Sequence, residues 1–185
     1  MEGYNEMGYI LNEYWHGMQR ASAEWCMEQA KSLKRYYYDD HFDAIGLIEF
    51  LKETANRDYK TAEMAATDIM EYLLCIYISP NDDSVVNYWL HGIRKSIKLF
   101  ESGLDISVKN KKGSTLVRKD LEEYWTEIYA SAIKRIKRTL KDSTDVPLET
   151  EKIPAEVPWA IDDFLNKSIG ELINMIDEPK IAKEQ

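Results

Sequence analysis

The stretch Val117–Lys141, VRKDLEEYWTEIYASAIKRIKRTLK, carries the clearest structural pattern in the chain. Its apolar side chains recur every three or four residues, as they do on one face of an α-helix. They are Leu121, Trp125, Ile128, Ala132, Ile136 and Leu140. Acidic residues gather near the start of the stretch and basic residues near its end, which is the order that suits the helix macrodipole. The stretch is therefore predicted to form one amphipathic helix.

The same period recurs through most of the chain. Further helices are predicted over residues 16–34, 43–56, 59–78 and 85–101, with a short one over 159–166. Asn56-Arg57-Asp58 and Pro80 are predicted to separate neighbouring helices, and Ser102–Thr115 is predicted to be a loop. No stretch alternates apolar and polar residues as strands do. The sequence predicts an all-α single domain over residues 1–177 and a frayed tail over 178–185. This domain is a bundle of five or six helices with a Pro-bearing C-terminal segment that ends in a short helix.

Composition excludes several classes of protein. The two cysteines, Cys26 and Cys75, are too few for a disulfide framework or a four-Cys zinc module. The longest near-continuous apolar run, Leu73–Ile78, is far shorter than the roughly 20 residues that span a bilayer. The start of the chain lacks the basic and apolar regions of a signal peptide. We expect a cytoplasmic globular protein that makes no membrane contact.

Charge is distributed unevenly along the chain. The formal net charge is −9, yet residues 91–141 hold 13 basic and six acidic side chains, a balance of +7. The remaining residues hold 11 basic and 27 acidic side chains, a balance of −16. Either the two signs face each other within one monomer, or the basic stretch contacts a partner. The candidate partner-binding residues are Lys109, Lys111, Lys112, Lys134, Arg135, Lys137, Arg138 and Lys141.

Three groups of residues resemble a known family. They are Glu24–Ala30 with Asp39–Ile45, Tyr88-Trp89 with Ile93-Arg94, and Val146–Glu149 with Ile153–Trp159. The last group, with its Pro and Trp at fixed offsets, is the most specific. Over about residues 23–165 the chain resembles the bacterial, cyanobacteria-rich domain-of-unknown-function family numbered twenty-nine. The resemblance implies an all-helical fold and assigns no activity.

The chain departs from this family's pattern on two helices. On the predicted helix over residues 43–56, only Glu53 remains of an acidic pair, and further departures lie on the helix over 59–78. Where the family usually carries a His, a Lys and a Trp, this sequence has Tyr72, Cys75 and Ile76. The resemblance leaves open whether these replacements mean that an activity has been lost.

One pair of residues has the spacing of a helical ribonuclease. Arg35 and His41 are separated by five residues, as in ribonucleases of the HEPN type, where the His acts as acid or base and the Arg steadies the phosphate. This metal-independent ribonuclease is the alternative function. Glu13 and His16 form only half of a di-iron motif, and no Gly-rich nucleotide loop occurs, so we expect no metal and no cofactor.

The C-terminal prolines point to a structural anchor. Pro154 and Pro158 stiffen the chain just before Trp159, so the large ring is predicted to fasten this segment to the bundle. For the whole chain, the sequence favours a non-enzymatic interaction protein. We expect it to bind an acidic protein or a second copy of itself, and we expect no binding to nucleic acid, because the overall charge repels phosphates.

Overall fold

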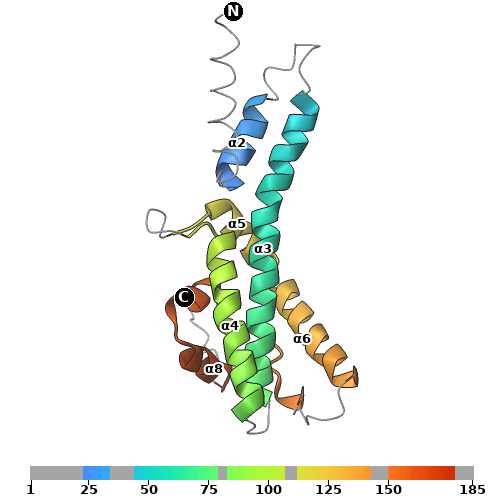
Figure 1. The fold of residues 1–185 in the computed structure, drawn as a ribbon, viewed down its shortest axis with the longest axis vertical. Coiled ribbons are helices and arrows are strands. Elements are labelled where there is room, and N and C mark those ends of the chain that lie inside the picture. The colour runs from blue at the N-terminus through green and yellow to red at the C-terminus, as the bar shows by residue number, and fades with distance from the viewer. Residues whose placement is uncertain (1–22, 34–43, 79–82, 107–111, 143–149, 178–185) are drawn as a thin grey trace, which may run out of the picture. The chain divides into compact units, whose positions relative to one another are not determined.

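The computed structural model describes residues 23–33, 44–78, 83–106, 112–142 and 150–177 (Figure 1). These residues contain seven α-helices and one short 3-10 helix, and none of them forms a strand. The helices are α2 (Ala23–Leu33), α3 (Ala44–Ile78), α4 (Asp83–Gly103), α5 (Thr115–Glu123), α6 (Trp125–Asp142), η1 (Thr150–Lys152), α7 (Ile161–Asn166) and α8 (Ile169–Asp177). The all-α prediction is confirmed.

The contacts between residues divide the chain into two compact units, 1–57 and 58–185. In the first unit, α2 buries Ala23, Cys26 and Ala30 at helical spacing. The beginning of α3 buries Ile48, Leu51 and Ala55 in the same way. The second unit holds the rest of α3 and all later helices, and it contains the residues discussed below. The single domain over 1–177 stays a prediction.

Two predicted helix boundaries are wrong. The predicted break at residues 56–58 lies inside α3, which continues from Ala44 to Ile78. None of the three residues is Pro or Gly, and the buried Ala55 and Ala62 are seven residues apart, which is two helical turns. The chain therefore has no local reason to leave the helix there.

The predicted helix over 117–141 is divided at Tyr124. The φ of Tyr124 is −107° and its ψ is 15°, outside the helical range. Its N–H still donates to Asp120 O at 3.2 Å, and Ile128 N–H donates to Tyr124 O at 3.0 Å. The hydrogen-bond ladder thus passes through the distortion, so α5 and α6 follow one another closely.

α3 and α4 pack against each other through small residues. A Cβ on Gly103 would lie 2.6 Å from the backbone nitrogen of Ala62, and one on Gly92 would lie 2.6 Å from the ring of Tyr72. Real Cβ contacts are longer than this, so the two helices approach as closely as they do because glycine occupies both positions. Gly113, which lies two residues before α5, has a φ of +72°, a backbone conformation that suits glycine.

An aromatic core joins the C-terminal segment to α4 and α6. The ring of Phe164 on α7 lies 5.8 Å from that of Phe100, 5.6 Å from that of Trp125 and 6.0 Å from that of Trp159, measured between ring centroids. These separations are typical of favourable aromatic pairs. In Figure 1 this C-terminal segment runs beside α4 and ends in α8.

Candidate functional site

The basic residues of α6 line a hollow on the surface. Five α6 side chains border this hollow, whose volume is about 530 Å³: Ser131, Lys134, Arg135, Lys137 and Arg138. The opposite side of α6 buries Ile128, Tyr129, Ala132 and Ile136. Four cations predicted from the sequence therefore lie together, because the apolar stripe of the helix turns them away from the core. We call Lys134, Lys137 and Arg138 the outer cations of α6.

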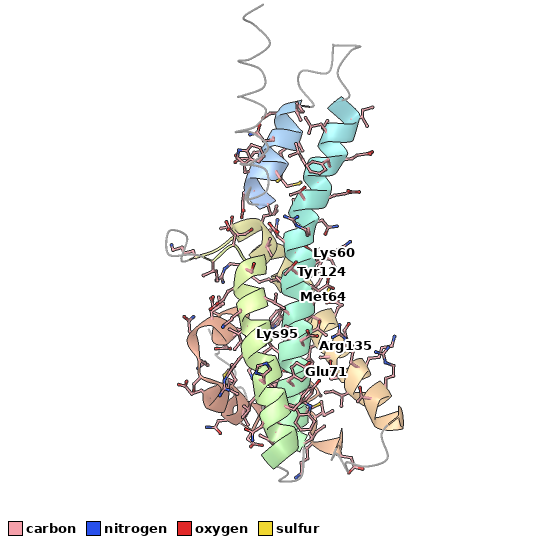
Figure 2. The ribbon with its side chains drawn as sticks, viewed as in Figure 1. Lys60, Met64, Glu71, Lys95, Tyr124 and Arg135 are labelled. Atoms are coloured by element: carbon pink, nitrogen blue, oxygen red, sulfur yellow. The ribbon has the colours of Figure 1, made fainter. Side chains whose placement is uncertain are left out.

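Arg135 differs from the outer cations because it is held by α3. Its guanidinium donates to Asp68 Oδ1 at 2.6 Å and lies 3.6 Å from Glu71 Oε2. Figure 2 shows Arg135 and Glu71 near each other between α6 and α3. The side chain of Glu71 is 19% exposed, so its carboxylate keeps little water. Arg135 therefore fastens α6 to α3, and its charge is largely engaged there.

The electrostatics of Glu71 follow from this arrangement. Burial raises the pKa of the Glu71 carboxyl above its ordinary 4.5, and the negative charge of Asp68 raises it further. The positive charges of Arg135 and, more weakly, Arg138 lower the same pKa and offset part of the rise. The ion pairs stabilise a carboxylate that burial alone would disfavour.

The outer cations lie on the exposed side of α6. They make no ion pair with any residue in the part of the chain that the structure describes. Lys134, Lys137 and Arg138 are all exposed. The backbone of Lys141 belongs to the end of α6, and its side chain lies outside the description.

The basic loop residues do not join this hollow in the described structure. Lys109 and Lys111 lie outside the described residues. Lys112 borders a different hollow of about 520 Å³, between α5 and α7. There its carbonyl accepts a hydrogen bond from Arg118 Nε at 2.7 Å, while Arg118 also pairs with Asp162 at 2.7 Å. Among the described residues, the candidate site is therefore narrower than the predicted basic stretch and is formed by α6.

Trp159 and Pro158 lie away from this site. Trp159 is 1% exposed, and its indole Nε1–H donates to Leu172 O at 2.7 Å. The carbonyl of Trp159 accepts from Trp125 Nε1 at 2.8 Å, and Tyr129 Oη donates to Pro154 O at 2.8 Å. Pro158 is partly buried. α6 thus holds the Pro-bearing segment by two hydrogen bonds to backbone oxygens.

The positions that depart from the family pattern lie near Glu71. The ring of Tyr72 covers Gly92 of α4, and Ile76 is partly exposed. Cys75 is buried, and its burial, followed by the charge of Glu71, raises the pKa of its thiol to about 12. At neutral pH this thiol is protonated and a poor nucleophile.

Other predicted chemistry lies outside the described residues. Arg35 and His41, the ribonuclease candidates, are in this group, as are Glu13 and His16. Within the described ranges, no three His, Cys, Asp or Glu side chains are grouped so as to hold a metal ion. No described helix is both long and apolar enough to cross a membrane.

Sequence reasoning missed Asp68 and Glu71 as the partners of Arg135. Their spacing of three residues placed them on one face of a helix, and this was visible in the sequence. Nothing in the sequence indicated that α6 would lie against that face. The pairing is a product of tertiary packing.

The comparison with protein families agrees with the resemblance seen in the sequence. The family described as domain of unknown function DUF29 matches residues 19–169, which is most of the 185-residue chain. The chain therefore belongs to the DUF29 family. No curated protein and no solved structure matches it.

Proposed function

We propose that this chain is a non-enzymatic, bacterial and cytoplasmic interaction protein that binds an acidic protein surface through the outer cations of α6. The observation that carries the proposal is the hollow lined by Ser131 and four cations, three of which make no ion pair with a described residue. Exposed cations attract an acidic partner over a distance of about one Debye length, roughly 8 Å at physiological ionic strength.

The position of Arg135 supports a binding role for this face. Its pairing with Asp68 and Glu71 fixes α6 against α3, so the outer cations project from a helix that is held in place. A rigid helix loses less conformational freedom on binding than a loop does. Arg135 itself is a support for the site, and it is left unchanged in the test.

The test is affinity capture from the native cell with two charge-reversed variants. The first changes Lys134, Lys137 and Arg138 to Glu. The matched control changes three exposed cations of α4 to Glu: Arg94, Lys95 and Lys98. Both variants change the net charge equally, so nonspecific charge effects are the same in each. Circular dichroism checks that both remain folded.

We expect one or more acidic proteins to be captured by the wild type and by the α4 variant and to be lost with the α6 variant. Capture should also weaken as salt rises, because exposed charges are screened. Equal capture by the two variants, or capture that does not depend on salt, would show that the outer cations are only a solvated helix face.

A further inference from the structure

The exposed side of α6, extended by Tyr124 and by Glu123 at the end of α5, carries charges of opposite sign on its two halves. The exposed residues on the N-terminal half include Glu123, Tyr124 and Glu127, and those on the C-terminal half are Lys134, Lys137 and Arg138. Between them lie two small exposed residues, Ala130 and Ser131. We call this set the α6 stripe. Its sign reverses about the Ala130–Ser131 midpoint.

Further acidic residues from α3 and α5 lie near the acidic half of the α6 stripe. Tyr59 of α3 is affected by this region: burial first, and then the charges of Glu63, Asp120 and Glu127, raise the pKa of its phenol to about 12. Negative charges from α3, α5 and α6 therefore converge beside the start of α6. Beside the basic half, the carboxylates of Asp68 and Glu71 pair with Arg135, and Arg138 acts on Glu71 more weakly.

The charges of the α6 stripe do not satisfy one another within one molecule. Glu127 and Lys134 are seven residues apart, or about 10.5 Å along the helix axis, which is too far for an ion pair. At the closer spacing of four residues the stripe instead places like charges together: Glu123 with Glu127, and Lys134 with Arg138. Such like-charge pairs destabilise a helix. Within one molecule, the charges of each half of the stripe therefore lack an oppositely charged neighbour on the stripe itself.

We propose that the acidic surface recognised by the outer cations is the acidic half of the α6 stripe on a second copy of this chain, the two stripes lying antiparallel about a two-fold axis near Ala130 and Ser131. This inference rests on the proposed function and names its partner. A two-fold interface uses the same patch on both copies, so each contact occurs twice.

The antiparallel register matches charge with charge. With Ala130 opposite the partner's Ser131, Glu127 lies opposite the partner's Lys134, and Glu123 lies opposite the partner's Arg138. In this register Lys134 and Arg138 each have an oppositely charged counterpart on the partner, and Lys137 lies at the edge of the stripe.

The small central residues allow the two helices to approach. Interhelical distances are about 8–10 Å and depend on the side chains at the crossing, and Ala130 and Ser131 are among the smallest. From Tyr124 to Arg138 the stripe is about 21 Å long. One helix pair of this length gives an interface at the small end of the known range, so the dimer is expected to be weak and sensitive to salt.

The experiment uses two single charge reversals in the full chain, Glu127→Lys and Lys134→Glu. In a dimer of either variant, residues 127 and 134 carry like charges across the interface at both contacts. When the two variants are mixed, both contacts again join opposite charges. The mass in solution is measured by light scattering at about 0.05 M and about 0.5 M salt, where screening lengths are roughly 14 Å and 4 Å. Arg94→Glu on α4 is the control.

We expect the wild type and the control to form dimers at low salt and to dissociate at high salt. Each single variant should be monomeric, and their equimolar mixture should recover the dimer. If the charge-reversed variants fail to fold, disulfide cross-linking tests the same interface independently. Ser131→Cys should give a disulfide-linked dimer under mild oxidation, whereas Lys95→Cys should not, and the native Cys26 and Cys75 are buried.

Two results would overturn this inference. A wild type that is monomeric at low salt would exclude self-association, and the proposed function would still stand if reversal of the outer cations abolished capture of another acidic protein. A dimer that survives both single reversals, with no recovery specific to the mixture, would place the interface elsewhere. Loss of the proposed function is recognised separately, by capture that is the same for the α6 and α4 variants.

Discussion

A single guanidinium, that of Arg135, lies against two carboxylates of α3 and sets a pH dependence for the fold. The pKa of Glu71 is higher in the folded chain than its ordinary 4.5. The folded state therefore binds this proton more tightly than the unfolded state does. The contribution of Glu71 to stability is fully present below pH 4.5 and is lost as pH rises through the folded-state pKa.

We predict that Glu71→Gln removes this loss, because glutamine resembles the protonated carboxyl and carries no charge. The variant should match the wild type at pH 4 and exceed it in urea midpoint at pH 7. Arg135→Gln should lower the urea midpoint at pH 7, because Arg135 lowers the pKa of Glu71 and its loss leaves the buried carboxylate without its ion pair. Urea unfolding followed by circular dichroism between these pH values measures both. Parallel curves for the wild type and Glu71→Gln would contradict the prediction.

At the scale of elements, the packing of α3 on α4 depends on Gly103. A Cβ at this position would lie 2.6 Å from a backbone nitrogen, which cannot rotate away as a side chain can. We predict that Gly103→Ala costs about 1–3 kcal/mol of stability, as overpacking does. Gly170 in α8 is the matched control, since nothing lies within 4 Å of its added Cβ. There Gly→Ala should stabilise by about 0.5–1 kcal/mol. Urea midpoints that shift equally at both positions would contradict the packing argument.

The attachment of the C-terminal segment depends on Trp159. Its ring is 1% exposed and its N–H reaches α8, so truncation removes both packing and a hydrogen bond. We predict that Trp159→Ala costs about 2–4 kcal/mol. Trp159→Phe keeps most of the ring and should cost about 1 kcal/mol for the lost hydrogen bond. An unchanged melting midpoint for Trp159→Ala would exclude an anchoring role.

Local patterns in the sequence predict most of the helices and fail where tertiary contacts decide. The period of three or four residues identifies the buried faces of α3, α4 and α6. It does not locate the distortion at Tyr124, next to Trp125, whose ring packs into the aromatic core. The outer cations of α6 are visible as a charge cluster. The engagement of Arg135 is not, because its carboxylate partners lie 64 and 67 positions away in the sequence.

For the whole molecule, the proposed preference for an acidic protein over nucleic acid follows from the separation of charge along the chain. Residues outside 91–141 have a balance of −16, against +7 within that stretch. At low salt, the many acidic residues of the chain repel a polyanion such as nucleic acid over a longer distance. A protein with one local acidic patch can instead approach the outer cations directly. Proteins that do bind nucleic acid gain affinity as salt falls, because phosphate contacts release counterions.

We therefore predict that a fluorescently labelled single-stranded oligonucleotide shows no change in anisotropy with the wild type at physiological or at low salt. A variant that changes Glu122, Glu123 and Glu127 to Lys replaces three exposed acidic residues of α5 and α6 by basic ones, and it should bind the oligonucleotide with the usual salt dependence. Binding by the wild type that strengthens as salt is lowered would mean that the outer cations act on phosphates despite the acidic remainder of the chain. The acidic half of the α6 stripe would then be insufficient to exclude nucleic acid, and the selectivity for an acidic protein surface would be lost.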